Sequence, residues 1–395
     1  MKHILFFLLF CTFCFSDFGS STLLLERSWT ITGDPDDFID FRGALAVNNS
    51  NQRVTSIQIE PVGDYFTDES GTIWVTYLGP MNDSEITISA KTTLDVDYDT
   101  EIFSDPHPPN KPLPSTPLTT ASSAIRSQAQ SLRDENSSLH TILRITNWVN
   151  SFVKYDEGYW NETNSATQVF DQKKGVCVQY THLFISLARS LGFETRFVSG
   201  YAFGDRWQPH TWVEVYLSDY GYLPVDPTFG QIGILDNRHA ILSYGSDQLS
   251  SYDLLLSRNQ NATLEVRDSV QVLSSSLRLD PVEQSISFDP NSYLVDIMLT
   301  NNRMEYLFGT YSFATPAEFG TFDNSMVLLE PNQSTHRYYG LNHSYFDDSY
   351  SYSIPVSSTF NDAVSKKNLL VDGRSPICIL PFVLLFLLYL KTLPG

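Results

Sequence analysis

The sequence predicts an α+β protein in which a core of helices and a β-hairpin lies between two mainly antiparallel β-sandwich domains. Three observations predict this order. Short strand patterns separated by turn residues occupy 22–104, helical periodicity begins after residue 122, and strand patterns return over 259–358. A linker with six prolines, residues 105–121, separates the first sandwich from the core, which is expected to extend over 122–258.

Composition limits the function classes. The chain has 395 residues and is 42% hydrophobic, which is enough for two or three packed domains and excludes disorder as the main state. It carries 25 Lys and Arg against 45 Asp and Glu, for a net charge of -20. Because an acidic surface repels phosphate and no segment gathers basic residues, nucleic acid is excluded as a partner.

The first 16 residues have the pattern of a secretory signal peptide. A positively charged start precedes an apolar stretch from Ile4 to Phe15, and the small residues Cys14 and Ser16 suit the positions before a cleavage site. We therefore expect residues 1–16 to be removed, together with Cys11 and Cys14, and the body of the protein to be exported.

The C-terminus predicts attachment to a membrane. Pro376 to Leu390 is an uninterrupted apolar run, which as a helix would span roughly 22 Å, less than the ~30 Å hydrocarbon core. It is either a short transmembrane helix with Lys391 at the inner face, or a processed tail, since Asn361 to Ala363 and the spacer after them loosely resemble a lipid-anchor signal. Both interpretations place the body outside the cell, at the surface, on a stalk over 359–375.

The exported body keeps one cysteine, Cys177, because Cys378 lies in the apolar tail. A disulfide framework is therefore excluded for this body. Seven Asn-x-Ser/Thr sequons suit an extracytoplasmic glycoprotein. They are at Asn48, Asn82, Asn136, Asn161, Asn261, Asn332 and Asn342.

The first sandwich carries a calcium-like pattern of carboxylates. Asp95, Asp97 and Asp99 are spaced as in a calcium loop, but Thr100 stands where such a loop needs glycine, and no Glu follows at the twelfth position. We interpret the three as the solvated face of a strand. No metal site and no cofactor are predicted, and calcium dependence stays open.

Cys177 is predicted to lie in the first turn of a buried helix. Apolar residues recur at helical spacing after it, from Tyr180 to Leu191, and Gly192 ends the pattern. The helix dipole and the nearby Lys173 and Lys174 would favour a thiolate. The alternative is a small buried side chain without chemistry, the usual state of a lone cysteine.

A predicted hairpin supplies partners for this thiol. His210 to Leu217 alternates as a strand, Asp219 to Gly221 forms a turn, and the returning strand ends at Asp226. His210 and Asp226 should therefore lie close together, so that the carboxylate orients the imidazole. With Cys177 they would form a nucleophile, a general base and an orienting residue.

The same residues carry a resemblance to the transglutaminase-like superfamily over Leu139 to Leu235. It implies a papain-like core in which Cys177 is the nucleophile, His210 the general base and acid, and Asp226 its orienting partner. The flanking Val176 and Val178 are similar to the microbial branch, in which amide hydrolysis is as open as crosslinking. The matching blocks are Gly175 to Cys177, Arg189 to Gly192, Arg196 to Tyr201, His210 to Tyr216 and Leu223 to Thr228.

We therefore predict an enzyme that attacks protein or peptide amides at the cell surface and forms a thioester on Cys177. Trp212, Trp207 and Tyr201 are candidates for contacting the substrate, with aromatic core packing as the alternative. Two other functions stay open: a protease-like peptide hydrolase that uses the same three residues, and a cell-surface binding or adhesion module without catalysis.

Overall fold

The computed structural model describes residues 19–372. It leaves out 62–63, 99–100, 110, 234, 278–281, 321–322, 343, 345, 347–349 and 362. The predicted signal peptide, 1–16, and the predicted apolar tail, 376–390, lie outside the described residues. Among the helices of the described part, none combines the length and the apolar character that crossing a bilayer requires.

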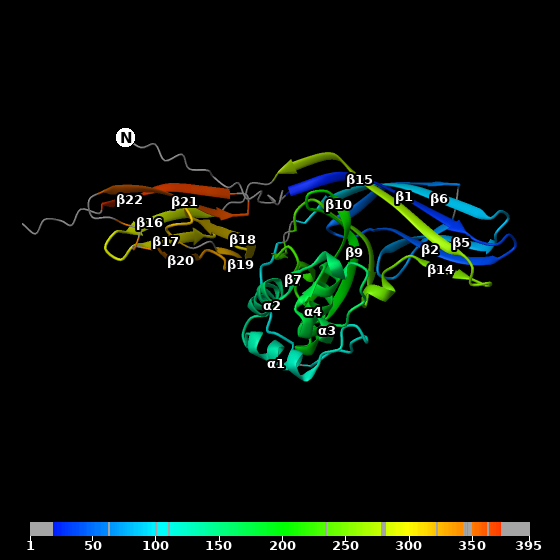
Figure 1. Cartoon of the computed structure of the whole chain (residues 1–395), viewed down its shortest axis with the longest axis horizontal. Coiled ribbons are helices and arrows are strands. Elements are labelled where there is room, and N and C mark those ends of the chain that lie inside the picture. The colour runs from blue at the N-terminus through cyan, green and yellow to red at the C-terminus, as the bar shows by residue number, and fades with distance from the viewer. Residues whose placement is uncertain are drawn as a thin grey trace, which may run out of the picture.

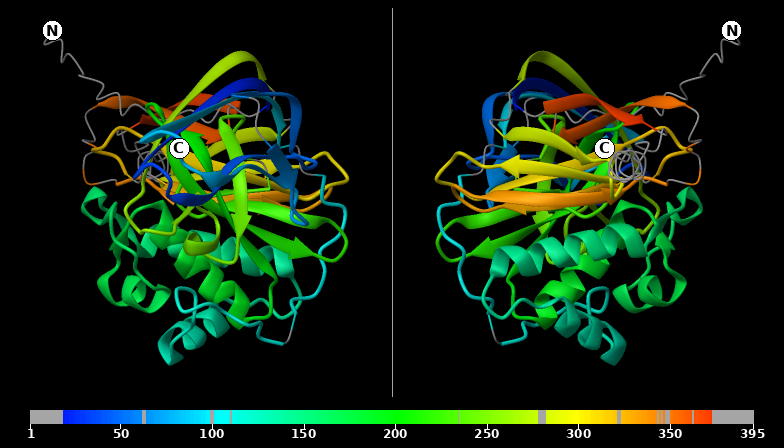
Figure 2. Two further views of the ribbon diagram at one scale, coloured as in Figure 1. Left: turned by 90° about the vertical axis from the view of Figure 1, so that its right-hand side faces the viewer. Right: turned by 90° about the vertical axis from the view of Figure 1, so that its left-hand side faces the viewer.

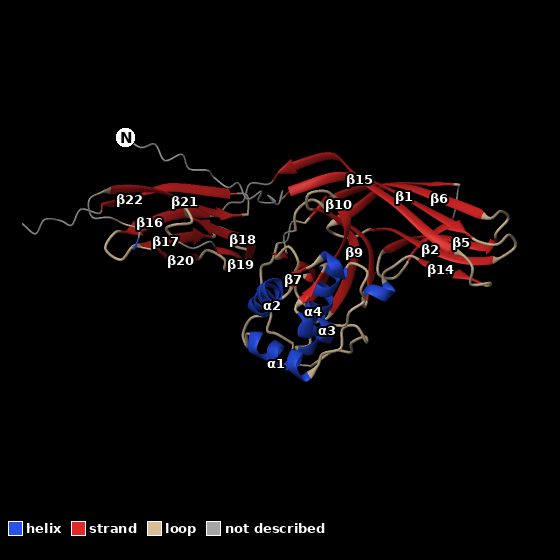
Figure 3. Cartoon of the chain, in the orientation of Figure 1, coloured by secondary structure: helices blue, strands red, loops and turns tan. Residues whose placement is uncertain are grey.

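The chain folds into a helical region and three groups of antiparallel sheets (Figure 3). One group lies at each end of the long axis in Figure 1, and the helices gather on one side between them. Figure 2 shows the same arrangement end-on, with the helices below most of the strands.

The N-terminal sandwich consists of two four-stranded sheets, with the orders β15-β1-β6-β3 and β14-β2-β5-β4. Alternate residues of β1 are buried, which places Trp29 and Ile31 against Phe41 of the opposite sheet. The strands are β1 (Gly19–Thr32), β2 (Phe38–Val47), β3 (Gln52–Glu60), β4 (Asp64–Thr67), β5 (Thr72–Pro80), β6 (Glu85–Asp97), β14 (Leu254–Ser257) and β15 (Thr263–Leu277).

This sandwich differs from the prediction, because residues after 253 complete it. β14 pairs with β2, and β15 pairs with β1 along its whole length. The sequence analysis assigned 259–277 to the second sandwich and 254–258 to the core, and both assignments are wrong. β15 is mostly exposed, so its sequence has no strong alternation, and its partner strand lies more than 200 residues earlier in the chain.

The core is a five-stranded antiparallel sheet of order β12-β11-β10-β9-β13, with helices on one face and the N-terminal sandwich on the other. Val213 and Val215 of β10 pack with helix residues such as Phe184, whereas Trp212 packs toward β1, β2 and β6. Its elements are α1 (Ser123–Leu132), α2 (Ser138–Phe152), α3 (Ala166–Gln172), α4 (Cys177–Ser190), β7 (Lys154–Tyr155), β8 (Lys174–Gly175), β9 (Thr195–Phe203), β10 (Trp207–Leu217), β11 (Gly221–Asp226), β12 (Gln231–Ile232), β13 (His239–Gly245), and two 3-10 turns at Glu157–Tyr159 and Gln248–Ser250.

An ion network around a buried arginine binds the N-terminal sandwich to the segment that enters it from the core. Arg27 of β1 contacts Asp253 at 3.1 Å and Asp268 at 2.8 Å, and its side chain is 5% exposed. Asp253 also accepts hydrogen bonds from the indole of Trp29 and the backbone N–H of Ala44. Since buried charges are costly unless paired, this network holds the segment between core and sandwich in one place.

The C-terminal sandwich packs a three-stranded sheet, β16-β17-β20, against a four-stranded sheet, β19-β18-β21-β22. It is tied to α2, where the Asn147 side chain bonds both the N–H and the C=O of Met326. The predicted stalk is wrong over Ala363–Asp372, which pairs with β21 as a full strand. The strands are β16 (Glu283–Asp289), β17 (Leu294–Thr300), β18 (Leu307–Ala314), β19 (Asp323–Leu329), β20 (Ser334–Gly340), β21 (Ser351–Phe360) and β22 (Ala363–Asp372).

Candidate active site

Cys177 is the first residue of α4, the most buried helix of the core. The helix can begin here because Gly175 has no side chain: a Cβ at this position would lie 2.4 Å from the Cβ of Gln179. The Gln179 side chain instead accepts a hydrogen bond from the backbone N–H of Val176 and fixes the start of the helix. The thiol is thereby held at the positive end of the helix dipole, as the sequence predicts.

The thiol is almost closed off, with Cys177 3% exposed. Burial alone would raise its pKa. Hydrogen bonding and Coulomb attraction to His210, together with hydrogen bonds from Thr211, outweigh burial and lower the pKa of Cys177 below its ordinary value. Cys177 therefore lies in a setting that favours thiolate, not in the apolar setting of an inert buried cysteine.

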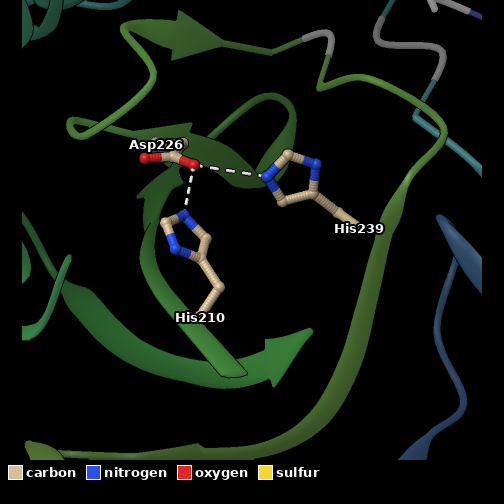
Figure 4. A group of neighbouring side chains, drawn as sticks. All are labelled: His210, Asp226 and His239. Atoms are coloured by element: carbon tan, nitrogen blue, oxygen red, sulfur yellow. Dashed lines mark hydrogen bonds and ion pairs between the residues drawn. The ribbon is translucent and has the colours of Figure 1, made fainter. Parts of the chain in front are cut away.

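His210, in β10, links the thiol to a carboxylate. Its Nε2 lies 2.7 Å from Oδ2 of Asp226 (Figure 4), which leaves Nδ1 as the ring nitrogen for Cys177. Burial disfavours the imidazolium, but attraction to Asp226 and hydrogen bonds to Asp226 and Cys177 raise the pKa of His210 to about 10. Phe229 stacks on the ring at a centroid distance of 4.7 Å, and Trp212 stacks at 6.0 Å, so the ring plane is fixed.

Asp226 ends β11 and is fully buried. Its Oδ1 accepts hydrogen bonds from the backbone N–H groups of Thr228 and Phe229, at 2.8 and 3.0 Å. Burial raises the pKa of a carboxyl group, but attraction and hydrogen bonds from His210 and His239 outweigh it, so the pKa of Asp226 lies well below its usual range. The hairpin that the sequence predicts thus brings an ionised carboxylate to His210.

The structure places the three predicted substrate-binding residues in the packing between the core sheet and the N-terminal sandwich. Trp212 is fully buried and supports the His210 ring. Tyr201 is 7% exposed and donates its hydroxyl hydrogen bond to Asp268 of the N-terminal sandwich. Trp207 is half-buried and packs edge-on against Phe203. All three belong to the packing between the core sheet and the N-terminal sandwich, so core packing, the alternative in the sequence analysis, describes them better.

Four residues near the site are absent from the sequence prediction. Thr211 helps to lower the pKa of the Cys177 thiol. Burial raises the pKa of Tyr155 and of Tyr252 to about 12. The charge of Cys177 adds to this rise for both. His239 is the second histidine on Asp226. Thr211 directly follows His210, so the sequence could have indicated that it lies near the thiol. Tyr155, Tyr252 and His239 belong to other segments, and only the tertiary fold brings these close to the site.

An oxyanion would meet the backbone N–H of Cys177, because the first N–H groups of a helix have no partner within it. Two glutamine side chains near the start of α4 in sequence are bonded elsewhere. Gln179 donates to the Glu162 carbonyl oxygen and accepts from Val176, and Gln168 caps the N-terminus of α3 through Ser165.

His210, Asp226 and His239 could in principle hold a metal, since one ligand atom from each lies within 4.8 Å of the others. Their arrangement fits hydrogen bonds better. Nε2 of His210 and Nε2 of His239 both contact Oδ2 of Asp226, at 2.7 and 3.2 Å. All three residues are buried, at 4% exposure or less. A metal would have to replace these bonds and would take His210 away from Cys177.

Comparison with known proteins agrees with this geometry. The family model described as the transglutaminase-like superfamily matches residues 126–227, which include the thiol, the imidazole and the carboxylate. Residues 126–227 form a transglutaminase-like domain. The resemblance that the sequence analysis identified is thereby confirmed for this part of the chain. No curated protein matches the sequence.

Three solved structures show distant likeness. A candidate cysteine protease from Cytophaga hutchinsonii is 18% identical over 66% of this chain and 93% of its own, with a TM-score of 0.46. A structure named only as a TGase is 13% identical over 45% of this chain and 46% of its own, with a TM-score of 0.22. Red sea bream transglutaminase is 8% identical over 89% of this chain and 80% of its own, also at 0.22. Likeness at this level carries no weight for the function.

Proposed function

We propose that this protein is a thiol enzyme that transfers the acyl group of a protein or peptide amide through a thioester on Cys177. The observation that carries the proposal is the buried pair of His210 and Asp226, 2.7 Å apart, together with the interaction of His210 that lowers the pKa of Cys177 at the N-terminus of α4. Nucleophilic catalysis requires a thiolate, a general acid and base beside it, and a group that orients that base.

Cys177 and His210 carry out successive steps of the proposed reaction. The Cys177 thiolate attacks the amide carbonyl, so that a C–S bond forms and the carbonyl electron pair moves to oxygen, near the backbone N–H of Cys177. The proton on Nδ1 of His210 passes to the leaving nitrogen as the C–N bond breaks and the thioester forms. An acceptor then attacks the thioester, His210 takes its proton, and the thiolate is restored.

Asp226 keeps His210 in the form that this cycle needs. A proton shared between Nε2 and the carboxylate leaves Nδ1 free to give a proton to the leaving group and to take one from the acceptor. Phe229 and Trp212 hold the ring so that neither contact is lost when the charge changes.

The group that attacks the thioester decides which of two reactions the site carries out. A lysine amine would give a crosslink and water would give hydrolysis, and both follow the same thioester. Incorporation of a fluorescent amine into casein, measured beside release of ammonia and of new peptide termini, distinguishes crosslinking, deamidation and proteolysis. Each activity should vanish in Cys177→Ser. A protein that shows none of the three, yet binds cell-surface proteins equally well with Cys177→Ser, would favour the binding module instead.

We also propose that the body acts outside the cell, attached through its C-terminal segment. The signal-like pattern of residues 1–16 supports export, and the seven sequon asparagines are all exposed in the structure, as glycosylated side chains must be. Protease added to intact cells should digest the body and leave cytoplasmic markers whole. Protection of the body until the cells are lysed would contradict this location.

A further inference from the structure

Asp226 holds a second histidine that the three-residue mechanism does not use. His239 begins β13 and directs Nε2 to Oδ2 of Asp226 at 3.2 Å, the same oxygen that His210 contacts (Figure 4). Its other ring nitrogen, Nδ1, lies 2.9 Å from Oδ1 of Asp236. One imidazole thus joins two carboxylates, and one of them belongs to the proposed catalytic set.

Proton counting assigns the charge of this ring. An ionised carboxylate accepts hydrogen bonds and donates none, so a nitrogen that bonds to one must carry a proton. Asp236 is held in the ionised form by donors from Gln231 at 3.2 Å and from the N–H of Arg238 at 3.1 Å. Asp226 is held by two backbone N–H groups. Both nitrogens of His239 therefore donate, and the ring is an imidazolium.

The surroundings hold His239 in place. It is fully buried, with the rings of Trp212, Phe229 and Tyr98 at centroid distances of 5.2, 5.8 and 6.2 Å. The titratable groups that face it are Asp226 of β11, Asp236 ahead of β13, His210 of β10 and Tyr98 after β6. Among these described groups the two carboxylates are the ones that carry negative charge at neutral pH, and both bond to it.

We propose that His239 is a positioning residue, a ring that is charged at neutral pH, fixes Asp226 against His210 and balances its charge. This inference rests on the proposed thiol chemistry. Negative and positive groups alternate from Cys177 through His210, Asp226 and His239 to Asp236. If His239 were neutral, the carboxylates of Asp226 and Asp236 would carry two negative charges near the site, and His210 would carry the single positive charge between them and the thiol. Their excess negative potential would disfavour a thiolate at Cys177.

The protonation of His239 can be measured without altering the site. Nitrogen NMR of the whole protein with labelled histidine should show both ring nitrogens of His239 protonated at about pH 7. The signals are assigned by their loss in His239→Gln, or by their movement in Asp236→Asn if the first variant does not fold. A neutral ring with one proton at that pH would overturn the inference.

The effect on the thiol is tested by the rate of iodoacetamide alkylation of Cys177 as a function of pH. Glutamine at position 239 keeps one N–H for Asp226 but no charge, so the midpoint should move upward by about one pH unit. His336→Gln is the matched control, because His336 bonds Asp296 at 2.9 Å in the C-terminal sandwich. It should leave the alkylation curve unchanged.

The outcomes separate the inference from the proposed function. A low midpoint in the unaltered protein that is the same in well-folded His239→Gln would refute the role of His239 and leave the thiol chemistry intact. An ordinary midpoint in the unaltered protein would refute the proposed function, whereas the NMR result would still decide the charge of His239. Equal melting temperatures of the variants exclude a merely structural cause for a shifted curve.

Discussion

Replacing Asp226 with Asn should abolish the activation of Cys177 while keeping the shape of the site. Asn has the same size, and its Oδ1 can still accept the N–H bonds of Thr228 and Phe229. Its amide group cannot stabilise a charged His210, whose Nε2 lies 2.7 Å away. If the amide donates to Nε2, the ring proton moves to Nδ1 and His210 can no longer take a proton at that atom.

The magnitude follows from the fraction of thiolate. A thiol with an ordinary pKa of about 8.5 is ionised in roughly one molecule in 300 at about pH 6. The pair with His210 lowers the pKa of Cys177, so the unaltered protein should hold a larger fraction of thiolate there, and full ionisation sets the upper limit of the effect. Alkylation by iodoacetamide at about pH 6 should therefore slow by up to ~300-fold in Asp226→Asn, and by only a few-fold at about pH 9.

The assay compares alkylation rates of Cys177 at these two pH values, with Asp296→Asn as the control. Asp296 bonds His336 at 2.9 Å in the C-terminal sandwich, so the control breaks an exposed His–Asp pair far from the thiol in sequence. Equal rates for Asp226→Asn and the unaltered protein at the lower pH would refute the link between the carboxylate and the thiol.

Three further predictions concern stability. Gly200→Ala should cost about 3 kcal/mol in urea unfolding, because its Cβ would lie 2.1 Å from a backbone oxygen, whereas Gly340→Ala, with open space around it, should cost little. Arg27→Met should cost up to about 3–5 kcal/mol, because the part-buried carboxylates of Asp253 and Asp268 lose their buried cation and are left with hydrogen bonds from uncharged donors. Arg53→Met, from an exposed pair, should cost less than ~1 kcal/mol. The pKa of His210 rises from 6.5 to about 10 on folding, so its contribution to stability is full below pH 6.5 and is lost as the pH rises toward 10. The unfolded thiol keeps, up to about pH 8.5, the proton that the Cys177 thiolate has lost, so the two groups offset each other below that pH. Urea unfolding should therefore show the fall in the free energy of unfolding between about pH 8.5 and 10.

The central site could be predicted because its signals are local. A helix that starts at Cys177 follows from apolar spacing over a few turns, and the approach of His210 to Asp226 follows from a hairpin with a short turn. Both depend on contacts between residues close together in the sequence. The transglutaminase-like motifs fall on the same short segments.

The remaining features depend on distant contacts. β15 pairs with β1, more than 200 residues earlier in the chain, and the sequence of neither strand indicates its pairing partner. Trp212 lies on the alternating strand that the sequence predicts, but the packing of Trp212 and Tyr201 depends on how the N-terminal sandwich covers the core sheet. His239 reaches Asp226 because β13 lies beside β9, on the far side of β9 from β10.

The central claim is that Cys177 is a thiolate held by His210, and the ultraviolet absorbance of the thiolate tests it most directly. The protein is titrated beside Cys177→Ser, so that the difference reports this thiol alone. The account predicts a midpoint well below the ordinary value of about 8.5, and a return toward that value in His210→Ala. A midpoint at or above the ordinary value, unchanged by His210→Ala, would contradict it.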